Sequence, residues 1–204
     1  MNTKQLAAAT ILSSLTVVVA YSRGLAAPSL PGVFELTTVS VFVSGFCFGR
    51  RVGVLVGLVS LAVYMLIPYP FAHPAAWLYS ISPVLLAVMM ALGAMYGWLG
   101  AVASDRIDPE KPRFALRLCI LGFAATLVYD VGSSLGFALA YPAFTSVYDA
   151  LVLTFIPLYY PWPPIVHTVT NTVIFGVLAP PLIRAVNRMP EALSIRGADT
   201  GSEP

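Results

Sequence analysis

The positively charged residues of this chain fall almost entirely into one of two alternating sets of connections between apolar segments. The sequence contains six such segments, and Arg23 is the only basic residue in the other set. The remaining ten of the 11 Lys and Arg residues are Lys4, Arg50, Arg51, Arg106, Lys111, Arg113, Arg117, Arg184, Arg188 and Arg196. Because cytoplasmic loops of membrane proteins are enriched in Lys and Arg, the pattern predicts an all-α integral membrane protein. We expect six transmembrane helices in the cell membrane, with N- and C-termini cytoplasmic.

The composition agrees with burial in a lipid bilayer. Of the 204 residues, 58% are hydrophobic and 10% are charged, and the mean hydropathy is +0.85. A soluble domain carries about 25% charged residues, and a charge at the bilayer centre costs roughly 2.5–3.5 kcal/mol. The net charge of +2 is small and says nothing about nucleic acid, and we expect no nucleic-acid partner. Cys47 and Cys119 are expected to be buried thiols on the reducing side rather than a disulfide.

We expect the spans at residues 5–27, 33–48, 52–67, 81–104, 114–141 and 163–186. The first segment also resembles a signal peptide, but the alternation of charge continues only if it stays as a helix. The second and third spans cover roughly 24 Å of a hydrocarbon core of about 30 Å, so neighbouring helices should shield them. Residues 1–187 therefore form the predicted six-helix transmembrane domain, and residues 188–204 a disordered cytoplasmic tail.

Small residues recur at the spacing of close helix contacts in two places. Glycines lie at every fourth position across the second and third spans, at Gly45, Gly49, Gly53 and Gly57. They predict tight helix packing or a hairpin that slides during transport. Ala9 and Ser13 form a small-xxx-small pair on the first helix, which internal packing or docking of another membrane subunit would explain.

Polar residues on the fifth and sixth spans lie at similar expected depths in the outer half of the bundle. Asp130 is about 20 Å from Arg117, and His167 and Asn171 lie roughly 6 and 12 Å from the outer end of their helix. An intramembrane carboxylate is a functional-site hypothesis by default. The predicted substrate-binding residues are Asp130, Ser133, Ser134, His167 and Asn171, and a purely structural hydrogen-bonded cluster is the alternative. No metal-ligand or nucleotide-binding motif occurs, so we expect no metal, cofactor or catalytic residue.

These motifs resemble those of the substrate-binding S components of energy-coupling factor (ECF) vitamin transporters. The similarity lies in the glycine-containing stretch 45–53, in residues 64–68, in residues 128–132 around Asp130, and in Asn171 with Phe175 and Gly176. The resemblance implies the substrate-binding subunit of an ECF-type ABC importer, which captures a vitamin or vitamin precursor from outside. It further implies docking on a transmembrane coupling subunit that works with two cytoplasmic ATPases. Ala9 and Ser13 are the best match to the docking pair of such proteins, and residues 141–162 to a lid.

Three other classes of function remain open from the sequence: a membrane enzyme, a scaffold protein and a stand-alone secondary transporter. An intramembrane aspartyl protease needs two carboxylates, and no second buried Asp accompanies Asp130. A serine protease needs an activated Ser, and Gly132, Ser133 and Ser134 with His167 do not form a GxSxG motif. A six-span scaffold protein would bind no small molecule, and a stand-alone secondary transporter would work without ATPases. The identity of the vitamin and the oligomeric state do not follow from the residues.

Overall fold

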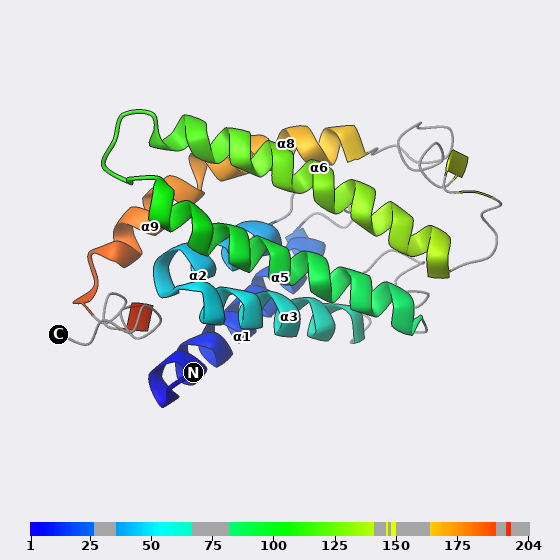
Figure 1. The fold of residues 1–204 in the computed structure, drawn as a ribbon, viewed down its shortest axis with the longest axis horizontal. Helices are drawn as coiled ribbons and strands as arrows, with labels where there is room; N and C mark the ends of the chain where they lie inside the picture. Colours follow the sequence, from blue (N-terminus) through cyan, green and yellow to red (C-terminus); the bar gives the residue numbers. More distant parts are fainter. Residues whose placement is uncertain are drawn as a thin grey trace.

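A computed structural model of the chain consists of helices, and the described residues contain no strand (Figure 1). The structure describes residues 1–26, 36–66, 82–140, 146, 148–149, 164–190 and 195–196. The helices are α1 (Thr3–Ala26), α2 (Leu36–Phe48), α3 (Arg50–Leu66), α5 (Pro83–Arg106), α6 (Phe114–Ala140), α8 (Pro164–Val177) and α9 (Ala179–Asn187). Each expected span corresponds to one of these helices, except that the sixth is divided between α8 and α9. The predicted lid, residues 141–162, lies almost wholly outside the described residues.

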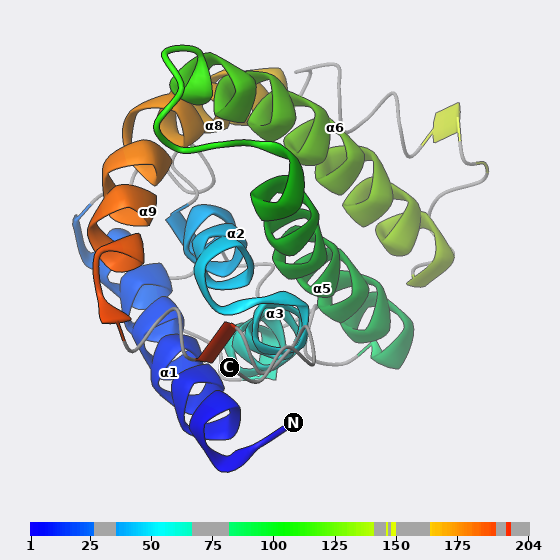
Figure 2. The same ribbon diagram turned by 60° about the vertical axis from the view of Figure 1, so that its left-hand side comes forward.

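Four helical segments are long and apolar enough to cross a membrane. They are Thr3–Ser22, Pro83–Arg106, Phe114–Ala140 and Ile165–Asn187. This agrees with the prediction of a helical membrane protein. α2 and α3 have only 13 and 17 residues, or about 20 and 26 Å of helix. Ten of the 13 residues of α2 are buried, and α1, α3, α5 and α9 surround it (Figure 2). Neighbouring helices therefore shield this short segment, as its length predicts.

The segment expected as the sixth span contains a break that was not predicted from the sequence. α8 ends at Val177, Leu178 forms a turn, and α9 begins at Ala179 with proline in its first turn. Pro180 and Pro181 have no backbone N–H, so two hydrogen bonds of a continuous helix cannot form there. Kinks are expected at such positions. The break lets α9 turn onto α2 while α8 stays packed along α6.

Glycines bring α5 into direct backbone contact with α2 and α3. A Cβ atom on Gly97 would overlap the carbonyl group of Gly53, and one on Gly57 would overlap the carbonyl group of Gly93. A Cβ on Gly45 would overlap the carbonyl oxygen of Gly97 in the same way. The close packing predicted from the glycine spacing is therefore confirmed for Gly45, Gly53 and Gly57. The facing glycines of α5 were not predicted.

A tight turn at Gly49 joins α2 to α3, as expected. Phe48 ends one helix, Arg50 begins the next, and Gly49 has a φ of 92°. A side chain in this left-handed region crowds the following carbonyl oxygen. The fourth glycine of the series thus serves the turn rather than the helix contact.

We therefore expect Gly49→Ala to lower the free energy of unfolding by about 1–2 kcal/mol. Gly49→Asn is the matched control, because Asn adopts left-handed angles more readily than Ala. The two variants can be compared by thermal unfolding in detergent. Equal stability of both variants and the wild type would show that the turn carries no such strain.

One end of the bundle gathers the connections that carry the basic residues. Arg184 of α9 donates two hydrogen bonds to the Pro109 carbonyl, at 3.1 and 3.0 Å, and its guanidinium lies 5.6 Å from the Phe114 ring centroid. Arg196 pairs with Asp105 at 3.0 Å. The start of α1 lies toward this end in Figure 1.

The start of α3 lies at the same end of the bundle. Because Gly53 faces Gly97 and Gly57 faces Gly93, α3 runs antiparallel to α5. Arg50 therefore lies toward the C-terminal end of α5, where Arg106 is found. The basic residues that the sequence assigns to one set of connections thus share one end of the structure.

From the predicted tail, Ile195 packs against the core and its carbonyl accepts a 3.4 Å bond from the Gln5 amide; disorder of the remaining tail stays a prediction.

Candidate functional site

α6 and α8 pack antiparallel in a register that aligns their polar residues. Successive contacts are four residues apart on both helices, and positions four apart share one face of a helix. The pairs, in order, are Gly122 with Phe175, Thr126 with Asn171, and Asp130 with His167. The Phe175 ring lies where a Cβ of Gly122 would be, so the glycine allows the close approach. This apolar contact positions the polar side chains of the next two turns.

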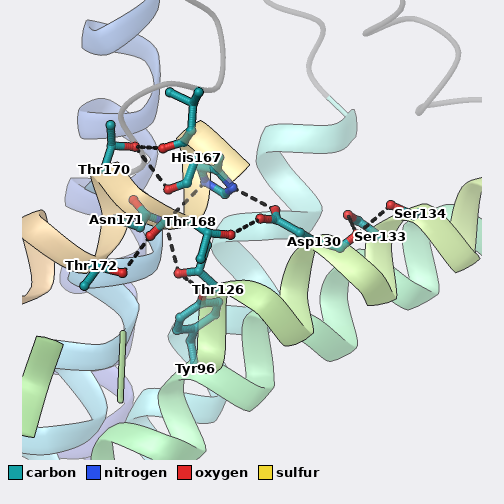
Figure 3. A network of polar contacts seen from close by, with 11 residues as sticks. Tyr96, Thr126, Asp130, Ser133, Ser134, His167, Thr168, Thr170, Asn171 and Thr172 are labelled. Atoms are coloured by element: carbon teal, nitrogen blue, oxygen red, sulfur yellow. Dashed lines mark hydrogen bonds and ion pairs between the residues drawn. The ribbon is translucent and has the colours of Figure 1, made fainter. Parts of the chain in front are cut away.

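The carboxyl group of Asp130 makes hydrogen-bond contacts with two side chains of α8 (Figure 3). Its Oδ1 lies 2.7 Å from Nδ1 of His167, and Thr168 donates its hydroxyl to Oδ2 at 2.9 Å. Hydrogen bonds to a charged group contribute about 1.5–3 kcal/mol each. The edge-on ring of Tyr129, with its centroid 6.2 Å from that of His167, packs beside the pair. The carboxylate is thus held between two helices.

A chain of hydrogen bonds continues from His167 into the core. The Asn171 Nδ2 lies 3.2 Å from Nε2 of His167 and donates to the hydroxyl of Thr126 at 3.4 Å. Tyr96 of α5 donates its hydroxyl to the same Thr126 oxygen at 3.1 Å. The network therefore joins three helices. We call Tyr96, Thr126, Asp130, His167, Thr168 and Asn171 the polar cluster.

The polar cluster lies almost entirely out of contact with solvent. Asp130 is 5% exposed and Asn171 is fully buried. The Oδ1 atom of Asn171 has no hydrogen-bond partner, although its Nδ2 atom makes two contacts. An unsatisfied buried polar atom costs about 1–3 kcal/mol. Such a group in a native structure calls for a functional or structural explanation.

The structure brings together three of the five predicted site residues. Asp130, His167 and Asn171 form the centre of the polar cluster, as their common depth predicted. Ser133 and Ser134 do not contact the carboxylate; both hydroxyls donate to the backbone carbonyl of Asp130, at 3.1 and 2.6 Å. Serine commonly bonds its own helix backbone in this way. These two side chains therefore contribute no contact to the cluster.

Sequence reasoning missed Thr126 and Tyr96. Thr126 precedes Asp130 by four residues, just as His167 precedes Asn171 by four, and this matched spacing was a usable signal. Tyr96 carried no signal in the sequence, because a lone Tyr in an apolar helix most often belongs to the core. It is indeed fully buried, and its ring stacks on Phe175 at 6.1 Å.

The two residues predicted for partner docking lie on the inner face of α1. Ala9 is 1% exposed and Ser13 is 4% exposed, and α1 packs against α3 and α2. The alternative explanation for the pair, internal helix packing, accounts for both residues in this chain. Docking through them would require α1 to separate from its neighbours.

The arrangement at His167 differs from a serine-protease triad. In such a triad the imidazole Nε2 contacts the serine hydroxyl, and Nδ1 contacts the aspartate. Here Nδ1 contacts Asp130, but Nε2 contacts the amide of Asn171. The described geometry is suited to holding a charge or a proton, or to binding polar groups of a ligand.

Comparison with known proteins gives no assignment: no protein-family model, no curated protein and no solved structure matches this chain.

Proposed function

We propose that this chain is the substrate-binding subunit of an ECF-type ABC importer. It captures a vitamin or vitamin precursor from outside the cell, and it docks on a transmembrane coupling subunit that works with two cytoplasmic ATPases. The observation that carries the proposal is the polar cluster around Asp130. Burying a carboxylate, an imidazole and an amide inside an apolar helical bundle costs free energy. A binding site for a polar small molecule would explain why these groups are there.

The proposed membrane topology has six spans, with α8 and α9 together forming the sixth. The end that carries ten of the 11 basic residues is assigned to the cytoplasm because of the positive-inside rule. Asp130 is 16 residues, or about 24 Å of helix, from the start of α6 at that end. The polar cluster then lies in the outer half of the membrane, where a subunit that captures substrate from outside needs its site.

A thermal-shift screen of the purified protein against vitamins and their precursors tests the proposal. A ligand present at a thousand times its Kd adds about 4 kcal/mol to the free energy of unfolding. One member of the panel should therefore raise the unfolding temperature by several degrees. If no compound has an effect, the six-span scaffold becomes the better explanation.

The polar cluster makes a prediction about affinity. Asp130→Asn keeps the shape of the side chain but removes its charge, so it should raise the Kd of the compound found in the screen at least about tenfold. Ser133→Ala is the matched control on the same helix, because that hydroxyl bonds only the backbone of Asp130. Isothermal titration of both variants provides the comparison. Unchanged affinity in Asp130→Asn would place the ligand elsewhere.

The partner assignment rests on the sequence resemblance. It predicts that the tagged chain, extracted from its native membrane, co-purifies with two ATPase subunits and one further membrane protein. Purification of the chain without any ATPase, under conditions that keep known ABC complexes intact, would contradict the assignment.

The contact between Asp130 and His167 favours a second candidate function, transport driven by an ion gradient. Buried carboxylates and histidines form proton relays in many transporters. Proteoliposomes that contain this chain alone, with an imposed pH gradient, separate the two functions. Accumulation of the compound found in the screen without ATPases would support gradient-driven transport. Accumulation only after addition of the coupling subunit and ATPases would support the importer.

A further inference from the structure

The outward face of α6 is apolar along most of its length and begins with two arginines. Leu116, Ile120 and Phe123 are 56%, 63% and 47% exposed, and residues three or four positions apart share one face of a helix. Arg113, which precedes the first residue of α6, and Arg117 in its first turn continue the same face toward the basic end, and both are exposed. The two positive charges therefore adjoin an exposed apolar surface.

The opposite face of α6 packs inside the bundle. Leu118 is fully buried. A Cβ atom on Gly122 would overlap the Phe175 ring of α8, and α6 also packs against α5. α6 is one of the four helices that are long and apolar enough to cross a membrane, and it runs along the outside of the bundle (Figure 2). The outward face is thus the one that lipid would cover.

The two arginines have no acidic partner among the described residues. Neither forms an ion pair there, whereas Arg196 at the same end is paired with Asp105 at 3.0 Å. The acidic residues closest in sequence are Asp108 and Glu110, in the connection before α6, and the Asp108 carboxylate accepts a 3.0 Å hydrogen bond from the backbone amide of Glu110. Both guanidinium groups are thus available to a group outside the chain.

Both guanidinium groups also lie within reach of lipid headgroups. Arg117 is three residues, or about 4.5 Å, from the start of α6. An arginine near the end of a membrane helix extends its charged group toward the membrane surface and keeps its stem against apolar groups. Its planar fork of N–H groups matches the oxygens of a phosphate. The start of α6 therefore presents two phosphate-binding groups beside a surface that suits acyl chains.

We propose that Arg113 and Arg117 bind the headgroup phosphate of one anionic phospholipid, whose acyl chains lie along Leu116, Ile120 and Phe123. A basic residue near the membrane surface strengthens the binding of an anionic lipid about fivefold. A zwitterionic phospholipid carries a compensating positive charge beside its phosphate, so it gains less. A soluble acidic protein would match the charges but would leave the adjoining apolar face uncovered. The inference depends on neither the substrate nor the partner subunits of the proposed importer.

Native mass spectrometry of the full chain in detergent tests the proposal with two added lipids, phosphatidylglycerol and phosphatidylcholine. We expect the first molecule of phosphatidylglycerol to bind at least about tenfold more tightly than the first molecule of phosphatidylcholine. Changing both arginines, Arg113→Gln with Arg117→Gln, should raise the Kd of phosphatidylglycerol at least about tenfold. Glycerol phosphate, which carries the headgroup charge without acyl chains, should not displace the bound lipid at equal concentration.

Two further variants serve as controls. Arg113→Lys with Arg117→Lys keeps both charges and should retain most of the preference for phosphatidylglycerol. Arg196→Gln removes a charge at the same end that Asp105 already neutralises, and it should leave the Kd of phosphatidylglycerol within about twofold of the wild-type value. Because both arginines are exposed, the glutamine variant should unfold within about 2 °C of the wild type in the absence of lipid.

Four results would overturn the proposal. They are equal affinity of the wild type for the two lipids, unchanged affinity in the glutamine variant, an equal loss in Arg196→Gln, and displacement of the lipid by glycerol phosphate. If the double glutamine variant does not fold, the single changes Arg113→Gln and Arg117→Gln decide the same point, with an expected loss of about fivefold each.

Discussion

Asp130→Leu is expected to lower the free energy of unfolding by about 3–5 kcal/mol, because it leaves two buried polar groups without their hydrogen-bond partner at about 1–3 kcal/mol each. The change removes the hydrogen-bond partner of His167 and of the Thr168 hydroxyl, which lie 2.7 and 2.9 Å from the two carboxyl oxygens. Thermal or denaturant unfolding in detergent measures the effect. It should be among the largest for any single polar residue of the chain.

A double variant shows whether the loss comes from the unpaired partner. Asp130→Leu with His167→Phe removes both members of the pair and should be much less destabilising than the sum of the single changes. Ser133→Ala, on the same helix, should change stability by no more than about 0.5 kcal/mol. If the single changes add in the double variant, the pair contributes no coupling energy and the polar cluster has been misassigned.

Gly97→Ala should lower the free energy of unfolding by about 3 kcal/mol, which is at the upper end of the range for overpacking. The new methyl group would overlap the carbonyl carbon and oxygen of Gly53 and would lie 2.7 Å from the amide nitrogen of Val54. These are backbone atoms, which cannot rotate away. Relief would require α3 and α5 to separate along their whole contact.

Gly132→Ala on α6 is the matched control. Its methyl group would meet the end of a flexible side chain, Leu92 Cδ2, at 2.9 Å. Alanine also favours a helix over glycine by about 1 kcal/mol, so the net effect should be close to zero. Similar losses in the two variants would mean that the glycine contact between α3 and α5 is not specifically close.

The helices themselves were largely predictable, because apolar runs separated by charged or proline-containing segments leave few alternatives in a membrane. The break between α8 and α9 shows the limit of that reasoning. A hydropathy average over residues 163–186 is unaffected by two prolines, whereas the backbone loses two hydrogen bonds at Pro180 and Pro181. The missing backbone hydrogen bonds, and not the mean hydropathy, decide where the helix breaks. The two adjacent prolines could therefore have predicted the break.

The site was predictable in part. Depth along each helix brought Asp130, His167 and Asn171 into one layer, but depth says nothing about which way a side chain points. Ser133 and Ser134 therefore appeared to belong with Asp130, although their hydroxyls bond the helix backbone. Tyr96 lies on a third helix, and its place depends on how α5 packs against α6. That contact is tertiary, and no spacing within one segment reveals it.

The small-residue pair on α1 carried a similar ambiguity. Ala9 and Ser13 indicate that something approaches α1 closely, but the spacing does not say what. In the structure the neighbours are helices of the same chain, which explains the pair without a partner subunit. The glycine series was easier to interpret. It lies on two short helices that were expected to pack against neighbours of the same chain.

The claim on which the account depends is that the polar cluster lies toward the outside and the basic end toward the cytoplasm. Single cysteines at positions 106 and 146, in a background with Cys47→Ser and Cys119→Ser, test it in intact cells with a membrane-impermeant maleimide. We predict labelling of Ser146→Cys in intact cells, and labelling of Arg106→Cys only after the membrane is permeabilised. The reverse pattern would place the cluster on the cytoplasmic side, and capture of substrate from outside would be contradicted.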